Sequence, residues 1–199
     1  MSTDTMPFSV LNQMLEFKDE DTNTAPLGKH SRSLKNTAVS FETGKSTMPF
    51  VEIYTDGACS KNPGPGGWGA LLIFNDTKKE IFGYQLETTN NQMEISAAIY
   101  ALQHLKKPCR VKLYTDSIYL QKGATEWIHN WQKNNWRKSD NKPVTNIDLW
   151  QNLQHEMKKH DIIWCWVKGH ANNEGNNIAD KLAVVGKETA KRMLKDASN

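Results

Sequence analysis

Two short apolar runs in this sequence end in the same residues. Ile53–Thr55 is followed by Asp56, and Leu113–Thr115 is followed by Asp116. Each run predicts a β-strand whose carboxylate lies just past its carboxyl end. If the two strands are parallel neighbours joined by a right-handed crossover, both acids lie at the sheet edge where open α/β sheets bind ligands. An Asp after a strand can also be a simple turn residue, but two in matched contexts favour chemistry.

Two further acids fall on predicted helices. Glu94 lies early in a helix that begins near Asn90, and apolar neighbours on its face would direct it towards the sheet. Taken alone, Glu94 fits a structural role at a helix N-terminus better than a catalytic one. Asp180 lies on the last predicted helix, where the alternative is a solvated acid. The loop before that helix carries His170, which the preceding strand would bring to the same sheet edge.

Carboxylates that face one another are electrostatically unfavourable unless a cation neutralises them or one stays protonated. A group of four acids without Cys or His ligands indicates a hard, oxygen-only metal site, which suits Mg²⁺ or Mn²⁺ better than zinc. Two such ions about 3.5–4 Å apart can activate a water molecule and stabilise the leaving oxygen of a phosphoryl displacement.

The elements that must position these residues follow from periodicity and turn signals. The pattern predicts an α/β fold from residue 49 to 195, with a five-stranded mixed sheet flanked by helices. The expected strands are Val51–Thr55, Trp68–Phe74, Glu80–Leu86, Val111–Thr115 and Ile162–Val167. A loop at Gly57–Gly67 and a turn at Asn75–Lys79 separate the first three, and the second and third form an antiparallel hairpin. The expected helices are Asn90–Leu105, short pieces up to about Trp136, Ile147–Lys159 and Asn176–Leu194.

Residues 1–48 lack sustained periodicity and predict a disordered tail. Residues 1–47 hold five basic and six acidic side chains, a net charge of −1. Because the whole chain carries +3, the remaining residues carry +4. This charge merely permits a polyanionic partner. The three cysteines have no C-x-x-C spacing, which argues against a disulfide framework or a zinc site. With no signal pattern or membrane span in the sequence, we expect a cytoplasmic protein.

Four segments, in order, resemble the motifs of type 1 ribonuclease H over essentially all of residues 50–190. They are Tyr54–Cys59 continued by Asn62–Ala70, Thr88–Glu94, Tyr114–Ser117, and Lys168–Ala171 followed by Asp180. The resemblance implies a ribonuclease H-like fold. It also implies an endonuclease that uses Mg²⁺, or Mn²⁺, to cut the RNA strand of RNA–DNA hybrids, leaving 3′-hydroxyl and 5′-phosphate ends.

The resemblance also implies roles for single residues. The metal ligands would be Asp56, Glu94, Asp116 and Asp180. His170 would assist proton transfer or product release. Asn62, Asn90 and Asn91 would contact the hybrid, where an amide can both donate to and accept from a ribose 2′-hydroxyl. Thr89 would bind a DNA phosphate.

Residues 125–143 match the substrate-binding protrusion of the family. Its expected substrate contacts are Trp127, Trp131, Lys133, Trp136, Arg137 and Lys138. Trp127 and Trp131 are four residues apart and would share a helix face, and we expect one or two of the three tryptophans to be local core. Basic residues between exposed aromatics suit a DNA backbone. The chain departs from the family pattern at Ile118, Asn172 and Asn177, none of which is an expected metal ligand.

Two other classes of function remain open at this stage. One is a non-catalytic module that binds hybrids or other nucleic acids and keeps the fold. The other is a different enzyme on the same architecture, such as a strand transferase, a junction resolvase or a metal phosphatase. A ribonuclease H domain of retroelement origin is a further alternative. We expect a monomer without a small-molecule cofactor.

Overall fold

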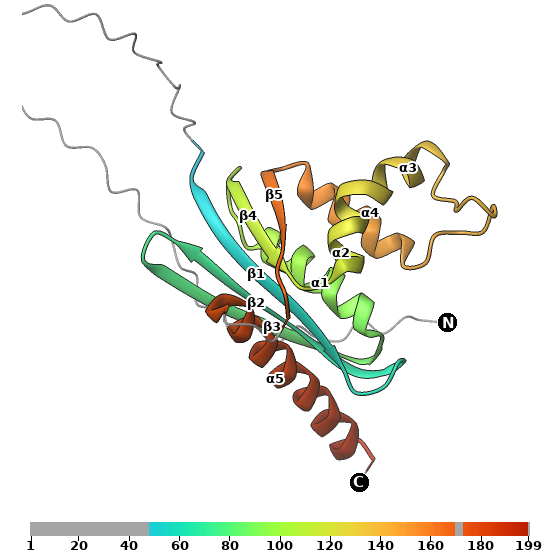
Figure 1. Ribbon diagram of the computed structural model, residues 1–199. Helices are drawn as coiled ribbons and strands as arrows, with labels where there is room; N and C mark the ends of the chain where they lie inside the picture. Colours follow the sequence, from blue (N-terminus) through green and yellow to red (C-terminus); the bar gives the residue numbers. More distant parts are fainter. Residues whose placement is uncertain (1–47, 170–172, 199) are drawn as a thin grey trace, which may run out of the picture. The chain divides into compact units, whose positions relative to one another are not determined.

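The computed structural model describes residues 48–169 and 173–198 of the chain (Figure 1). Apart from Met48, the expected tail of residues 1–48 lies outside the described residues, and so does His170. Within the described ranges, no helix is long and apolar enough to cross a membrane.

A five-stranded mixed sheet forms the centre of the domain, as the sequence predicts. The strands are β1 (Phe50–Cys59), β2 (Gly64–Phe74), β3 (Thr77–Thr88), β4 (Arg110–Thr115) and β5 (Asp161–Trp166), in the spatial order β3-β2-β1-β4-β5. The three strands β1, β2 and β3 pair antiparallel, whereas β4 pairs parallel with both β1 and β5. Thr55 and Thr115 are partners in the parallel ladder, so the two matched runs end at one sheet edge.

The first two strands are longer than the sequence predicts. β1 continues to Cys59 and β2 already begins at Gly64, so most of the predicted loop at 57–67 is strand. Gly57 and Gly67 in this stretch serve close packing against helices and not a turn. A Cβ on Gly67 would overlap the backbone of α5 (Glu174–Asp196) at Gly186. Glycine therefore marks a helix crossing in this stretch, which its composition alone did not distinguish from a loop.

The hairpin between β2 and β3 is also tighter than expected. Its turn involves Asn75 and Asp76, and β3 starts at Thr77, where the sequence predicted a turn up to Lys79. Asn75 has a φ of 51°, in the left-handed region that asparagine tolerates well. This conformation reverses the chain within fewer residues, so β3 begins three residues earlier than predicted, whereas β2 ends at Phe74 as predicted.

Helices cover both faces of the sheet (Figure 1). α1 (Asn90–Gln103) packs against β1 and β2 on one face and also contacts α4 (Ile147–Met157), whereas α5 packs against β1, β2 and β3 on the other. Because successive strand residues point to opposite faces, Gly57 faces α1 and Gly69 faces α5. The predicted helices are therefore confirmed in place, with ends shifted by two residues.

The protrusion (residues 125–143) is carried on short helical segments between β4 and α4. α2 (Ile118–Lys122) runs into a π-helical segment η1 (Gly123–Trp127) and then α3 (Ile128–Lys133). Gly123 lies against the ring of Trp150, which is fully buried. The predicted short helical pieces therefore end at Lys133, before Trp136.

Candidate active site

Asp56 and Asp116 lie at the edge where the parallel pairing of β1 with β4 stops. Asp116 follows the last residue of β4, as expected. Asp56, by contrast, lies inside β1 and pairs with Gly69 of β2, so the prediction that it follows its strand is wrong. The reason is that β2 continues to pair with β1 after β4 has ended. Both carboxylates still come from the same edge of the sheet.

Glu94 reaches this edge because α1 approaches β1 closely. A Cβ on Gly57 would overlap the backbone of Met93 and Glu94, so only glycine permits this approach. Asn90 Nδ2 donates to Glu94 Oε1 at 2.8 Å, and the hydroxyl of Ser117 donates to Glu94 Oε2. These two donors hold the Glu94 carboxylate beside the end of β4.

The start of α5 contributes to the same edge. Asn173 caps the helix by accepting from the N–H of Asn176 at 3.0 Å. The side-chain Nδ2 of Asn176, which is 2% exposed, donates to Asp116 Oδ2 at 3.2 Å. Asp180 lies one turn further along α5, next to Ala179, whose carbonyl faces Gly69 of β2. α5 therefore brings Asp180 towards the strand pair that holds Asp56.

The electrostatics of this carboxylate edge (Asp56, Glu94, Asp116 and Asp180) follow from burial and like charge. Burial and the charge of Asp116 raise the pKa of Asp56 to about 8, with smaller contributions from Asp180 and Glu94, although the Gly57 N–H donates to it at 2.7 Å. Burial raises the pKa of Glu94 to about 7, and hydrogen bonds from Ser117 and Asn90 oppose this shift. None of the four acids forms an ion pair with another described residue. Their negative charge is therefore uncompensated within the described protein.

The expected hybrid contacts fall into two groups. Around α1, Asn62 Oδ1 accepts from the N–H of Asn90 at 2.9 Å, and Thr89 caps the helix with Gln92 as the partner in a capping box. Asn91 is exposed on the first turn of α1. Asn90 and Asn91 lie within about one turn of Glu94 on α1, and Asn62 is linked to this turn through Asn90.

The second group is the protrusion. The rings of Trp127 and Trp131 lie 5.7 Å apart, which confirms that they share a face. Trp131 and Trp136 pack partly buried against the main core, as expected for one or two of the three tryptophans. A groove of about 240 Å³ between α1 and the protrusion is lined by Asn91, Tyr119, Trp131, Lys138, Val144 and Thr145. The structure thus brings together Asn91, Trp131 and Lys138, while Lys133 and Arg137 are exposed outside this groove.

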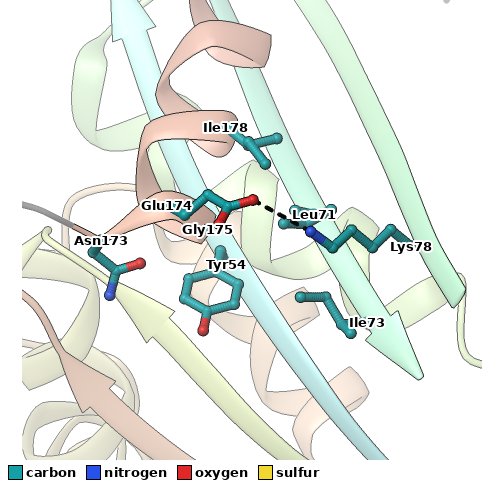
Figure 2. Close-up of a pocket in the computed structure, with 8 residues that line it drawn as sticks. All are labelled: Tyr54, Leu71, Ile73, Lys78, Asn173, Glu174, Gly175 and Ile178. Atoms are coloured by element: carbon teal, nitrogen blue, oxygen red, sulfur yellow. Dashed lines mark hydrogen bonds and ion pairs between the residues drawn. The ribbon is translucent and has the colours of Figure 1, made fainter. Parts of the chain in front are cut away.

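A second groove, of about 330 Å³, lies beside the start of α5 (Figure 2). Tyr54 forms part of it, and Lys78 reaches across to Glu174 in an ion pair of 3.3 Å. None of the four carboxylates lines this groove. It is therefore separate from the candidate active site.

Sequence reasoning missed the residues that orient the carboxylates. Ser117 could have been found, since a serine directly before a helix is a common N-cap, and its hydroxyl accepts from the Leu120 N–H. Asn176 gave no such signal because its contact with Asp116 joins residues far apart in the chain. His170 lies outside the described residues, and its neighbour Gly169 packs against Asp116.

Comparison with known proteins agrees with this architecture. The family model of RNase H matches residues 48–188. Over 151 residues the chain is 68% identical to a ribonuclease H of Rickettsia bellii, covering 76% of this chain and 97% of that protein.

Solved structures agree as well. The structure of LC9-RNase H1, a type 1 RNase H with the type 2 active-site motif, matches with a TM-score of 0.66 at 30% identity, over 72% of this chain and 74% of that one. LC11-RNase H1 in complex with an RNA/DNA hybrid matches with a TM-score of 0.52 at 25% identity, over 70% of this chain and 98% of that one. The fold of this chain is thus shared with these RNase H structures. The chain belongs to the type 1 ribonuclease H family and is a ribonuclease H enzyme.

Proposed function

We propose that the chain is an endonuclease that hydrolyses the RNA strand of RNA–DNA hybrids, with Mg²⁺ as its cofactor and 3′-hydroxyl and 5′-phosphate ends as its products. The observation that carries this proposal is the carboxylate edge. Its four acids come from β1, α1, α5 and the residue after β4, and they share a partly buried site in which no described basic residue pairs with them. Such a site is stable at neutral pH once a cation compensates its charge.

The donor chemistry of this edge fits a divalent metal of the kind that ribonucleases H generally use. Among the described residues, the four acids of this edge offer carboxylate oxygens as ligands, which favours Mg²⁺ or Mn²⁺ over zinc. The described residues contain no group of three or more Asp, Glu, His or Cys side chains already placed to hold an ion. Asp56, Glu94, Asp116 and Asp180 would therefore close around a metal as it binds, and the positive charge of the metal would offset their mutual repulsion.

Bound ions of this kind activate a water molecule and stabilise the leaving oxygen of a phosphoryl displacement. The chain's own residues would fix the geometry around them. Ser117 and Asn90 orient the two oxygens of Glu94, and Asn176 orients Asp116. His170, which follows Gly169 in the sequence, would assist proton transfer or product release.

Discrimination of RNA from DNA would reside in the amides around α1. Asn62, Asn90 and Asn91 can each donate and accept, as recognition of a ribose 2′-hydroxyl in a shallow minor groove requires. Thr89 would contact a DNA phosphate, and the tryptophans and basic residues of the protrusion would follow the DNA strand. The LC11 relative, which binds an RNA/DNA hybrid, supports this substrate class.

The proposal extends to the organisation of the chain. Residues 49–195 would form the catalytic domain and act as a monomer, with residues 1–48 as a tail that takes no part in the chemistry. The three cysteines are unpaired thiols, which fits a reducing cytoplasm.

The decisive experiment is cleavage of a labelled RNA–DNA hybrid with Mg²⁺, beside the same RNA as a single strand and in an RNA duplex. We expect cutting confined to the hybrid, abolished by EDTA and by Asp56→Asn. Tight hybrid binding without cutting, with either Mg²⁺ or Mn²⁺, would instead indicate a non-catalytic binding module. Cutting of a branched DNA junction in preference to the hybrid would indicate a resolvase.

A further inference from the structure

The side chain of Gln92 joins two parts of the molecule that are distant in sequence. Its Oε1 accepts from the N–H of Thr89 and from the hydroxyl of Thr88, both at 3.0 Å. Its Nε2 donates in the other direction to Asn146 Oδ1 at 3.3 Å. A carboxamide can donate and accept at the same time, so a single side chain serves both sides.

The hydrogen bonds continue from Asn146 to the base of the protrusion. Asn146 precedes α4 with a φ of 62°, and its Nδ2 donates to the hydroxyl of Tyr119 at 3.4 Å. The same hydroxyl accepts from the indole N–H of the fully buried Trp150, also at 3.4 Å. The ring of Tyr119 lies 5.8 Å from that of Trp127 and lines the groove that holds Trp131. Gln92 is thus linked by side chains to the aromatic part of the protrusion.

On its other side, Gln92 is linked to the residues expected to contact the scissile strand. The capping box fixes the first turn of α1, where the Asn90 side chain donates to Glu94 and the Asn90 backbone N–H donates to Asn62 Oδ1. Thr89, Asn90 and Asn91 therefore move with the end of α1 that Gln92 holds.

We propose that Gln92 is a positioning residue that fixes the spacing between the α1 end of the hybrid-binding surface and the protrusion. The inference rests on the proposed function, because it assumes that one hybrid lies across both parts. Hydrogen bonds that bridge two packed elements restrict the position of one element relative to the other, whereas apolar contacts alone let the elements slide past each other more easily. With the bridge in place, a hybrid held by the protrusion meets Asn90, Asn91 and Glu94 at a set distance.

The test compares hybrids of two lengths. Gln92→Met keeps the length of the side chain and removes the bridge, and Gln103→Met is the matched control at the other end of α1, where Gln103 Nε2 donates to Glu156 Oε1 at 3.4 Å. For a hybrid long enough to cover both parts, we expect Gln92→Met to raise KM about three- to tenfold with kcat within about twofold. For the shortest hybrid that the wild type cuts, KM should not change, and Gln103→Met should leave both values unchanged.

A second variant separates positioning from helix capping. Asn146→Gly removes the other half of the bridge, and glycine accepts the left-handed backbone at this position. If the bridge acts as a unit, the KM of Gln92→Met combined with Asn146→Gly is no higher than that of the more impaired single variant. Additive effects, or an equal fall of kcat on both hybrids, would overturn the proposal in favour of local capping. A wild type that cuts neither hybrid would refute the proposed function, and the Kd of the two hybrids would then still test the bridge.

Discussion

The carboxylate edge and the protrusion are built by different means. At the edge, backbone pairing positions Asp56, the close approach of α1 at Gly57 positions Glu94, and hydrogen bonds from Ser117, Asn90 and Asn176 hold Glu94 and Asp116. In the protrusion, aromatic rings pack on a buried tryptophan, and the basic side chains are exposed. The first arrangement concentrates charge on constrained elements, and the second spreads charge over solvated side chains. Changes at the edge should therefore alter the reaction steeply, whereas changes in the protrusion should alter affinity gradually.

The largest expected effect is on turnover at the carboxylate edge. Glu94→Gln removes one of the charges that would hold the metal, and we expect kcat to fall by at least about 10³-fold, since metal catalysis contributes several kcal/mol. Hybrid affinity should stay within about threefold, because the exposed contacts of the protrusion remain. Single-turnover cleavage and hybrid titration measure the two quantities. Glu188→Gln, an exposed acid on α5 paired with Lys191, is the control. A parallel loss of binding and cleavage would erase the contrast between the two regions.

The next effect concerns the packing beneath the protrusion. Gly123→Ala would place a methyl group on the ring of Trp150, and we expect the free energy of unfolding to fall by about 2 kcal/mol. Denaturant unfolding measures the change. Gly64→Ala is the control, because the nearest atom to its added Cβ would be Lys61 Cβ at 3.1 Å, a far milder contact. Equal stability of the two variants would mean that the tryptophan cluster adapts freely.

Removing charge from the carboxylate edge should raise stability, although it abolishes activity. Because the pKa of Asp56 is raised to about 8 from 3.8, the folded protein binds more protons than the unfolded chain between these values. Between about pH 4 and 8, Asp56 is ionised in the unfolded chain and still largely protonated in the folded protein, so stability falls as pH rises through this range. We expect Asp56→Asn to raise the free energy of unfolding by about 1–2 kcal/mol at pH 8 and to flatten its pH dependence, without a gain at pH 4.

Thermal unfolding across this pH range checks the prediction. Asp76→Asn in the β2–β3 turn, which is exposed, serves as the control. Addition of Mg²⁺ should raise the Tm of the wild type by linkage and have much less effect on Asp56→Asn. A destabilised Asp56→Asn variant at pH 8 would contradict the assignment of mutual repulsion at this edge.

The smallest effect is expected from the exposed charges of the protrusion. Replacing its three basic residues by glutamine should weaken hybrid binding about tenfold. The slope of log Kd against log salt concentration should also fall, by the amount that corresponds to about two to three phosphate contacts. The residues are Lys133, Arg137 and Lys138. At saturating hybrid, kcat should change by less than about twofold. The control makes the same charge change at the far end of α5, at Lys191, Arg192 and Lys195. If the salt dependence of Kd were the same for the two triple variants, the hybrid would not bind along the protrusion.

Much of the architecture was predictable because it depends on local patterns. Alternating apolar residues predicted the strands, and helical spacing from Asn90 predicted the start of α1. The parallel pairing of the runs that end at Asp56 and Asp116 was only a condition of the prediction, and the structure meets it. The loop assigned to 57–67 was wrong because glycines that permit helix contacts have the same composition as glycines in turns. A sequence pattern reflects a residue's neighbours in the chain and not the residues that pack against it.

The sequence by itself determined the kinds of groups in the site: four acids, an amide-rich helix start, and tryptophans interleaved with basic residues. Only the tertiary structure decided that Asp56 lies within a strand, that Ser117 and Asn176 orient two of the acids, and that Gln92 connects α1 to the base of the protrusion. These contacts join residues from 23 to 60 positions apart. They depend on strand pairing and on glycine-mediated approach of helices to the sheet, and no local pattern of residue types encodes those distances.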